Sequence, residues 1–60
     1  MASRVPTWRD IDRAVRDARV SIDGNDKAIL AVASGLLVAD GFLVGGDETR
    51  WLLKKIVAGG

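Results

Sequence analysis

Apolar residues recur at helical spacing in the first third of the chain. They follow one another at intervals of three or four residues, which places them on one narrow stripe of a helix: Trp8, Ile11, Val15 and Ala18. Thr7 is a favourable N-cap residue, and Asp10 three positions later can complete a capping box. The pattern therefore predicts a first helix at about residues 7–19, with a seam suited to one partner helix.

A short connection follows this helix. Asp23-Gly24 is a typical turn pair, and either Asn25 or Asp26 can cap the next helix. Val20 and Ile22 alternate with polar residues on either side of Ser21. We therefore expect an ordinary loop that is anchored to the core by these two apolar side chains.

A second helix is predicted at about residues 26–40, and it is apolar nearly all round. Large aliphatic residues line one side, and the other side carries a ridge of small residues: Ala28, Ala31, Gly35 and Ala39. A helix without a polar face is expected either at the centre of a bundle or in a bilayer. A ridge of small residues lets another backbone approach closely. We expect this helix to be the central and most buried element.

The stretch LLVADGFLVGG decides between a turn and a membrane span. The apolar run before Asp40 is shorter than the ~20 residues that a bilayer requires. Asp40 itself would cost roughly 2.5–3.5 kcal/mol in the hydrocarbon. If Asp40 is instead the C-cap and Gly41 adopts the left-handed conformation, Phe42 and Leu37 occupy the two positions that touch in a Schellman motif. The sequence therefore predicts a turn at Asp40-Gly41, and Leu43 or Val44 would then pack into the core.

A third helix is predicted at about residues 48–58. Asp47 can cap it, Glu48 opens it, and Lys54 and Lys55 lie in its later half, where the helix dipole favours positive charge. Its apolar face is broad: Trp51, Leu52, Leu53, Ile56 and Val57. The predicted fold is an all-α single domain over residues 1–60.

The junction between the last two helices resembles a known family. The segment VADGFLVGGDETRWLL is similar to the acidic helix–turn–helix junctions of tellurite-resistance TerB-type domains, with Ala39, Asp40, Gly41, Leu43 and Asp47 in the matching places. The resemblance covers about a quarter of the chain, and that fold needs a longer chain. It implies a turn between two helices, and no function is carried over from it.

Composition restricts the function more than any motif does. The 60 residues include neither Cys nor His, which excludes disulfides, thiolate metal sites and the usual general base. No catalytic, metal-binding or nucleotide-binding motif is present, so we expect no enzyme activity and no cofactor. A chain this short buries only about 60% of its unfolded surface, yet 48% of its residues are hydrophobic. We therefore expect oligomerisation, or docking onto a larger partner, to complete the fold.

The expected function is that of a non-enzymatic interaction or structural module, most simply a homo-oligomer. Small structural or accessory proteins of phages and bacteria fit this description. The residues predicted to make the contacts combine the first stripe, the small ridge and the last helix: Trp8, Ile11, Val15, Ala31, Gly35, Ala39, Trp51 and Leu52. Tryptophan is also the largest filler of a small core, so we expect both to pack mainly there, with one partly exposed. Asp40 is expected to form a structural ion pair with Arg13, Arg16 or Arg50.

Two alternatives remain open from the sequence. In the first, residues 28–46 form one membrane-inserted helix, as in holins or membrane-active peptides, with Asp40 facing a pore or a partner helix. In the second, the chain is a small helix-turn-helix dimer that binds DNA through Arg50, Lys54 and Lys55. The formal net charge of +1 gives little drive toward nucleic acid. The first residues lack the apolar core of a secretory signal, so we expect a cytoplasmic location.

Overall fold

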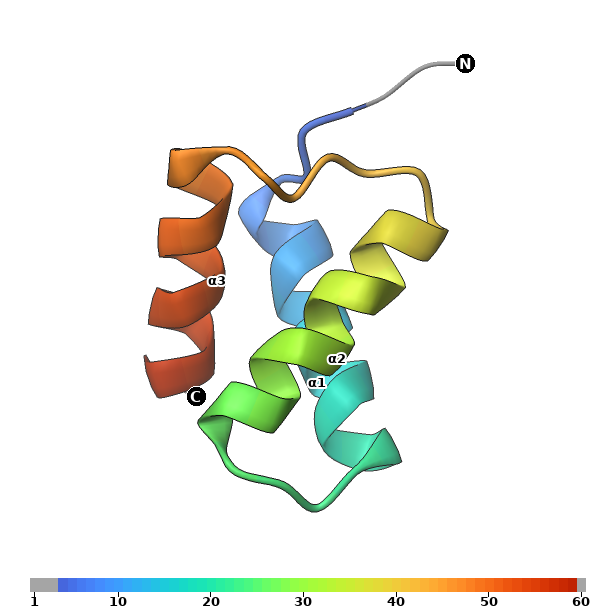
Figure 1. Ribbon diagram of the computed structural model, residues 1–60, viewed down its shortest axis with the longest axis vertical. Coiled ribbons are helices and arrows are strands. Elements are labelled where there is room, and N and C mark those ends of the chain that lie inside the picture. Colours follow the sequence, from blue (N-terminus) through green and yellow to red (C-terminus); the bar gives the residue numbers. More distant parts are fainter. Residues whose placement is uncertain (1–3, 60) are drawn as a thin grey trace.

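The computed structural model describes residues 4–59 and shows three helices within them. They are α1 (Trp8–Ser21), α2 (Asp26–Ala39) and α3 (Asp47–Gly59), and they fold back on one another (Figure 1). The part of the chain that the structure describes contains no strand, only an isolated parallel bridge between Arg4 and Phe42. The prediction of an all-α fold with three short helices is confirmed.

The start of α1 has the predicted capping box. The Thr7 backbone N–H donates to Asp10 Oδ2 at 2.9 Å, and the Asp10 N–H donates to Thr7 Oγ1 at 3.4 Å. The helix ends two residues later than predicted, and the Ile22 backbone N–H donates to the Ala18 carbonyl at 3.0 Å to close its last turn. Ile22 anchors the following loop against the core as expected. Val20 lies within the helix and is 89% exposed, so its predicted role as an anchor is wrong.

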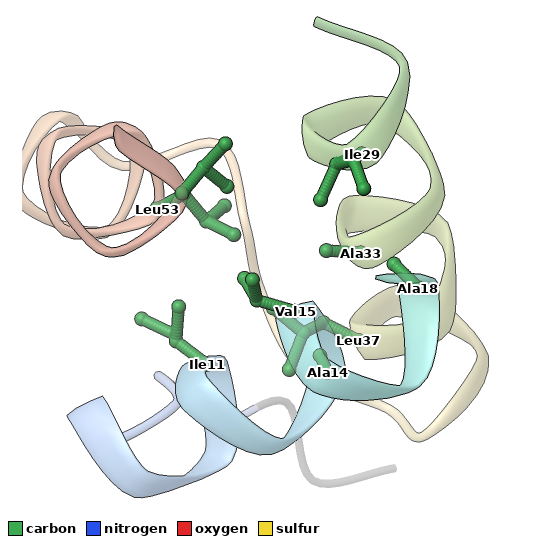
Figure 2. Packing of buried hydrophobic residues seen from close by; sticks show 9 residues of the cluster. Ile11, Ala14, Val15, Ala18, Ile29, Ala33, Leu37 and Leu53 are labelled. Carbon is green, nitrogen blue, oxygen red and sulfur yellow. The ribbon is translucent and has the colours of Figure 1, made fainter. Parts of the chain in front are cut away.

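The core is built from small and aliphatic side chains of all three helices, which converge on one interior (Figure 2). Its buried members are Ile11, Ala14, Val15, Ala18, Ile29, Ala33, Leu37, Leu53 and Val57. The sequence predicts that α2 is the central helix, but α1 has that place. Four of the nine buried residues belong to α1, which packs against both other helices, whereas α2 and α3 meet each other least.

The turn after α2 is the predicted Schellman motif. Gly41 has a φ of 90°, in the region that favours glycine. The Phe42 N–H donates to the Leu37 carbonyl and the Gly41 N–H to the Val38 carbonyl, both at 3.0 Å. The chain therefore leaves the helix axis at Asp40, and residues 28–46 do not form one helix. Among residues 4–59, no helix has both the length and the apolar character needed to cross a membrane.

The segment after the turn crosses one end of the bundle (Figure 1). The Leu43 N–H donates to the Arg4 carbonyl at 2.7 Å, and the Arg4 guanidinium lies 4.8 Å from the centre of the Phe42 ring. The sequence predicts that either Leu43 or Val44 packs into the core. Val44 packs against it, whereas Leu43 is exposed. These contacts fix the direction in which the chain enters α3.

Candidate interaction surface

The outer face of α2 is exposed and carries no charge. No charged residue occurs between Ala28 and Ala39. Four residues of this stretch are exposed: Ala31, Gly35, Val38 and Ala39. Three of them belong to the predicted ridge of small residues, which the structure therefore leaves on the outside. A surface helix ordinarily covers its outer face with charged or polar side chains, so α2 lacks the usual polar face. We call these four residues the α2 outer face.

Gly35 lies within this outer face and is not required by the fold of the single chain. A Cβ built at this position would meet no heavy atom within 4 Å. In the interior of a helix, glycine is less favourable than alanine by roughly 0.5–1 kcal/mol. The folded monomer thus gains nothing from glycine here. A glycine at such a position would allow a second backbone to approach closely.

An apolar groove lies between α2 and α3, beside the outer face. Its floor is formed by Leu30 and Ala31 of α2, Val44 of the connecting segment and Leu53 of α3, and the hollow has a volume of about 460 Å³. The Ser34 hydroxyl also lines the groove, but it donates to the Leu30 carbonyl at 2.8 Å. The only polar side chain on this floor is therefore satisfied within its own helix.

The groove continues toward the C-terminal end of α3. A second hollow of about 240 Å³ shares Lys27, Leu30 and Lys54 with the first and reaches Val57 and Ala58. The two hollows therefore form one surface, which we call the α2–α3 groove.

Three cations and one acid border the α2–α3 groove. Lys27, Arg50 and Lys54 are exposed at its edges, and Asp26 lies only at the end where α2 begins. Lys55, which the DNA-binding alternative groups with Arg50 and Lys54, instead has its ammonium 4.9 Å from the centre of the Trp51 ring. The predicted basic cluster of the last helix is thus divided between two places.

The remaining predicted contact residues lie elsewhere. Ile11 and Val15 have no exposed surface, so they form the core of the chain itself and are not available to a partner. Leu52 is partly buried against the core. Trp8 and Trp51 are 58% and 59% exposed, and the expectation that they fill the core is wrong. Trp51 is two positions from buried Leu53, which turns its side chain about 200° away from the core.

Asp40 is exposed and does not form the predicted ion pair. Within residues 4–59 the structure shows one ion pair, between Arg16 Nε and Asp12 Oδ2 at 3.1 Å on the surface of α1. Arg13 and Asp40 line a common polar hollow without reaching ion-pair distance.

Arg19 has a role that the sequence patterns do not indicate. Its guanidinium Nη2 donates to the Val57 carbonyl at 2.8 Å, and this contact joins residues 38 positions apart. The last carbonyls of a helix have no partner within that helix, and a positive charge near them is favourable. Arg19 therefore links the end of α1 to the end of α3. Periodicity and spacing give no signal for such a contact.

The capping box also lowers the pKa of Asp10. Hydrogen bonds from the Thr7 backbone N–H, and next from its hydroxyl, lower the pKa of the Asp10 carboxyl below its usual value. This carboxyl is engaged in the capping box, so its perturbation has a structural cause. Among residues 4–59, no three His, Cys, Asp or Glu side chains are grouped so that they could hold a metal ion.

Comparison of the chain with protein-family models, with curated proteins and with solved structures finds no match. The surface must therefore be interpreted from its own chemistry. Its two notable features are the uncharged outer face of α2 and the cation-bordered groove beside it.

Proposed function

We propose that this chain is a non-enzymatic interaction module that associates with copies of itself through the α2 outer face. The observation that supports the proposal is the absence of charge on a helix face that the monomer leaves exposed. A contiguous apolar surface left in contact with water is a candidate contact site. Val38, which is 56% exposed, is the largest apolar side chain of this surface.

The shape of the face suits packing between two helices. Helix axes approach to about 8–10 Å, depending on the side chains at the crossing point. Gly35 is flanked by Ala31 and Ala39 one turn away on either side, which favours the short end of this range. A two-fold pair of α2 helices would bring the same residues together from both copies, as isologous interfaces do. Val38 of each copy would then cover the small residues of the other.

The proposal is tested by the mass of the purified chain in solution. We expect light scattering to give a concentration-dependent mass above that of the 6.4 kDa monomer. Gly35→Leu should shift the equilibrium toward monomer, because its side chain would separate the two helices. Gly59→Leu is the matched control, since a Cβ at Gly59 also meets no atom within 4 Å, but at the end of α3. A monomeric wild type at every concentration, or equal effects of the two substitutions, would refute the proposal.

A further inference from the structure

The α2–α3 groove is a second apolar surface, which self-association through the α2 outer face does not explain. It is lined by Leu30, Val44 and Leu53 and shares Ala31 with the α2 outer face, whereas Gly35, Val38 and Ala39 do not border it. Along α3 it extends from Arg50 to Ala58, which corresponds to about 12 Å at 1.5 Å per residue. This length matches the spacing of apolar anchors at i, i+3 or i+4 and i+7 on a docked helix, about 10.5 Å from first to last.

The charges at the edges specify the partner more closely. Lys27 borders the groove on the α2 side, and Arg50 and Lys54 border it on the α3 side. A helix lying on the apolar floor would therefore have one cation beside one flank and two beside the other. Acidic residues on those flanks would complement the groove, and like charges would be repelled. Asp26 opposes this preference only at one end.

A second copy of this chain does not offer such a helix. The apolar stripe of α1 is buried in its own core, and the exposed residues of α1 include more arginines than aspartates. The acids of α3 are confined to its first turn. No helix within residues 4–59 therefore presents an exposed apolar stripe with acids along both sides.

We propose that the α2–α3 groove docks an amphipathic helix of another protein, with an aliphatic or aromatic stripe flanked by Asp and Glu. The inference goes beyond self-association and uses a surface that shares only Ala31 with the α2 outer face. The apolar floor supplies the contact area, and Lys27, Arg50 and Lys54 select the acidic flanks and set the orientation. Rim charges of this kind contribute mainly to specificity and association rate.

The probe is a synthetic helix of about 14 residues, or four turns. It carries Leu at the i, i+3, i+4 and i+7 positions and Glu on both flanks, and a side-chain staple holds it helical to remove the cost of ordering. A second peptide replaces every flanking Glu by Lys, and a third scrambles the Leu positions. We expect saturable one-to-one binding of the acidic helix alone. Amide chemical-shift changes in the labelled chain should concentrate at Leu30, Ala31 and Leu53.

Variants of the chain test the role of the cations. Replacing Lys27, Arg50 and Lys54 together by Gln should weaken binding of the acidic helix about tenfold, as expected for three rim ion pairs of ordinary strength. The matched control replaces Arg9, Arg13 and Lys55 by Gln, which removes the same charge outside the groove and should leave the Kd unchanged. Because the peptide series uses the wild-type chain, the test does not depend on whether a variant folds.

Each contrary outcome overturns the inference. These outcomes are no saturable binding of the acidic helix up to about 1 mM, equal binding of the basic helix, or shifts that map outside the groove. Tighter binding of duplex DNA or of anionic lipid vesicles at the same residues would assign the groove to those partners instead. Gly35→Leu should bind the peptide as the wild type does. Failure of self-association and failure of docking are therefore distinguishable.

Discussion

Gly41 is the residue on which the corner between α2 and α3 depends. Its φ of 90° lies in the left-handed region, which residues with a Cβ rarely adopt. We expect Gly41→Ala to destabilise the chain by about 1 kcal/mol, which corresponds to a fall in Tm of about 4–8 °C for a domain of this size. Thermal unfolding followed by circular dichroism measures this. Gly45→Ala is the control, since Gly41 alone among the described glycines has a positive φ. An unchanged Tm for Gly41→Ala would contradict the observed turn.

Substitution of Gly35 should have the opposite effect on stability, because its backbone is helical and a side chain at this position would meet no other atom. Gly35→Ala should stabilise the isolated monomer by about 0.5–1 kcal/mol, through better helix propensity and a less flexible unfolded chain. Urea unfolding at concentrations where the chain is monomeric measures this gain. A loss of monomer stability would show that Gly35 serves the fold of the single chain, and the argument for a contact at this position would then fail.

The capping box makes the stability of α1 depend on pH. Because the folded state lowers the pKa of Asp10, ionised Asp10 stabilises the fold at pH values above its unfolded pKa, whose reference value is 3.8. This stabilisation is lost as the pH falls from 3.8 through the lower folded pKa. We expect Asp10→Asn to unfold at a lower temperature than the wild type at pH 7, and the difference to shrink below pH 3.8.

The control for this prediction is Asp23→Asn. It removes one carboxylate from the exposed connection between α1 and α2 without touching the capping box. Its Tm difference from the wild type should be smaller at pH 7. A pH-independent difference for Asp10→Asn would show that the carboxylate charge does not stabilise the start of α1.

The helices show which parts of this fold could be predicted from the sequence. The capping box at Thr7 and the turn at Gly41 follow from local chemistry, because each depends on residues within five positions of one another. The buried stripe of α1 follows from spacing. Periodicity does not show where along a stripe the partner helix ends, however. For this reason the sequence predicts Trp8 in the core, although at the first position of α1 its side chain is exposed.

Contacts between distant segments could not be predicted in the same way. The hydrogen bond from Arg19 to the Val57 carbonyl depends on how α1 and α3 are placed, which no local pattern encodes. The same holds for Asp40, which has three arginines available by composition and pairs with none of them within residues 4–59. For the candidate surface, the sequence identifies the small residues of α2. The α2–α3 groove could not be predicted from the sequence, because it forms only when both helices pack against α1.

For the whole molecule, the central feature is the excess of apolar surface over what three short helices can cover. The interior takes only nine hydrophobic residues, and α2 keeps an uncharged face outside. A domain of this size is expected to be marginally stable by itself. Association through α2 would cover part of the exposed surface and add to the stability of the fold, since a partner that binds only the folded state stabilises it.

The most direct test of the account is an isotope-filtered NOE experiment on a mixture of labelled and unlabelled chains, which detects only contacts between copies. The account predicts NOEs from the Gly35 Hα protons of one copy to the Val38 methyl groups of another. Their absence, or NOEs confined to the Trp8 and Trp51 side chains, would contradict it.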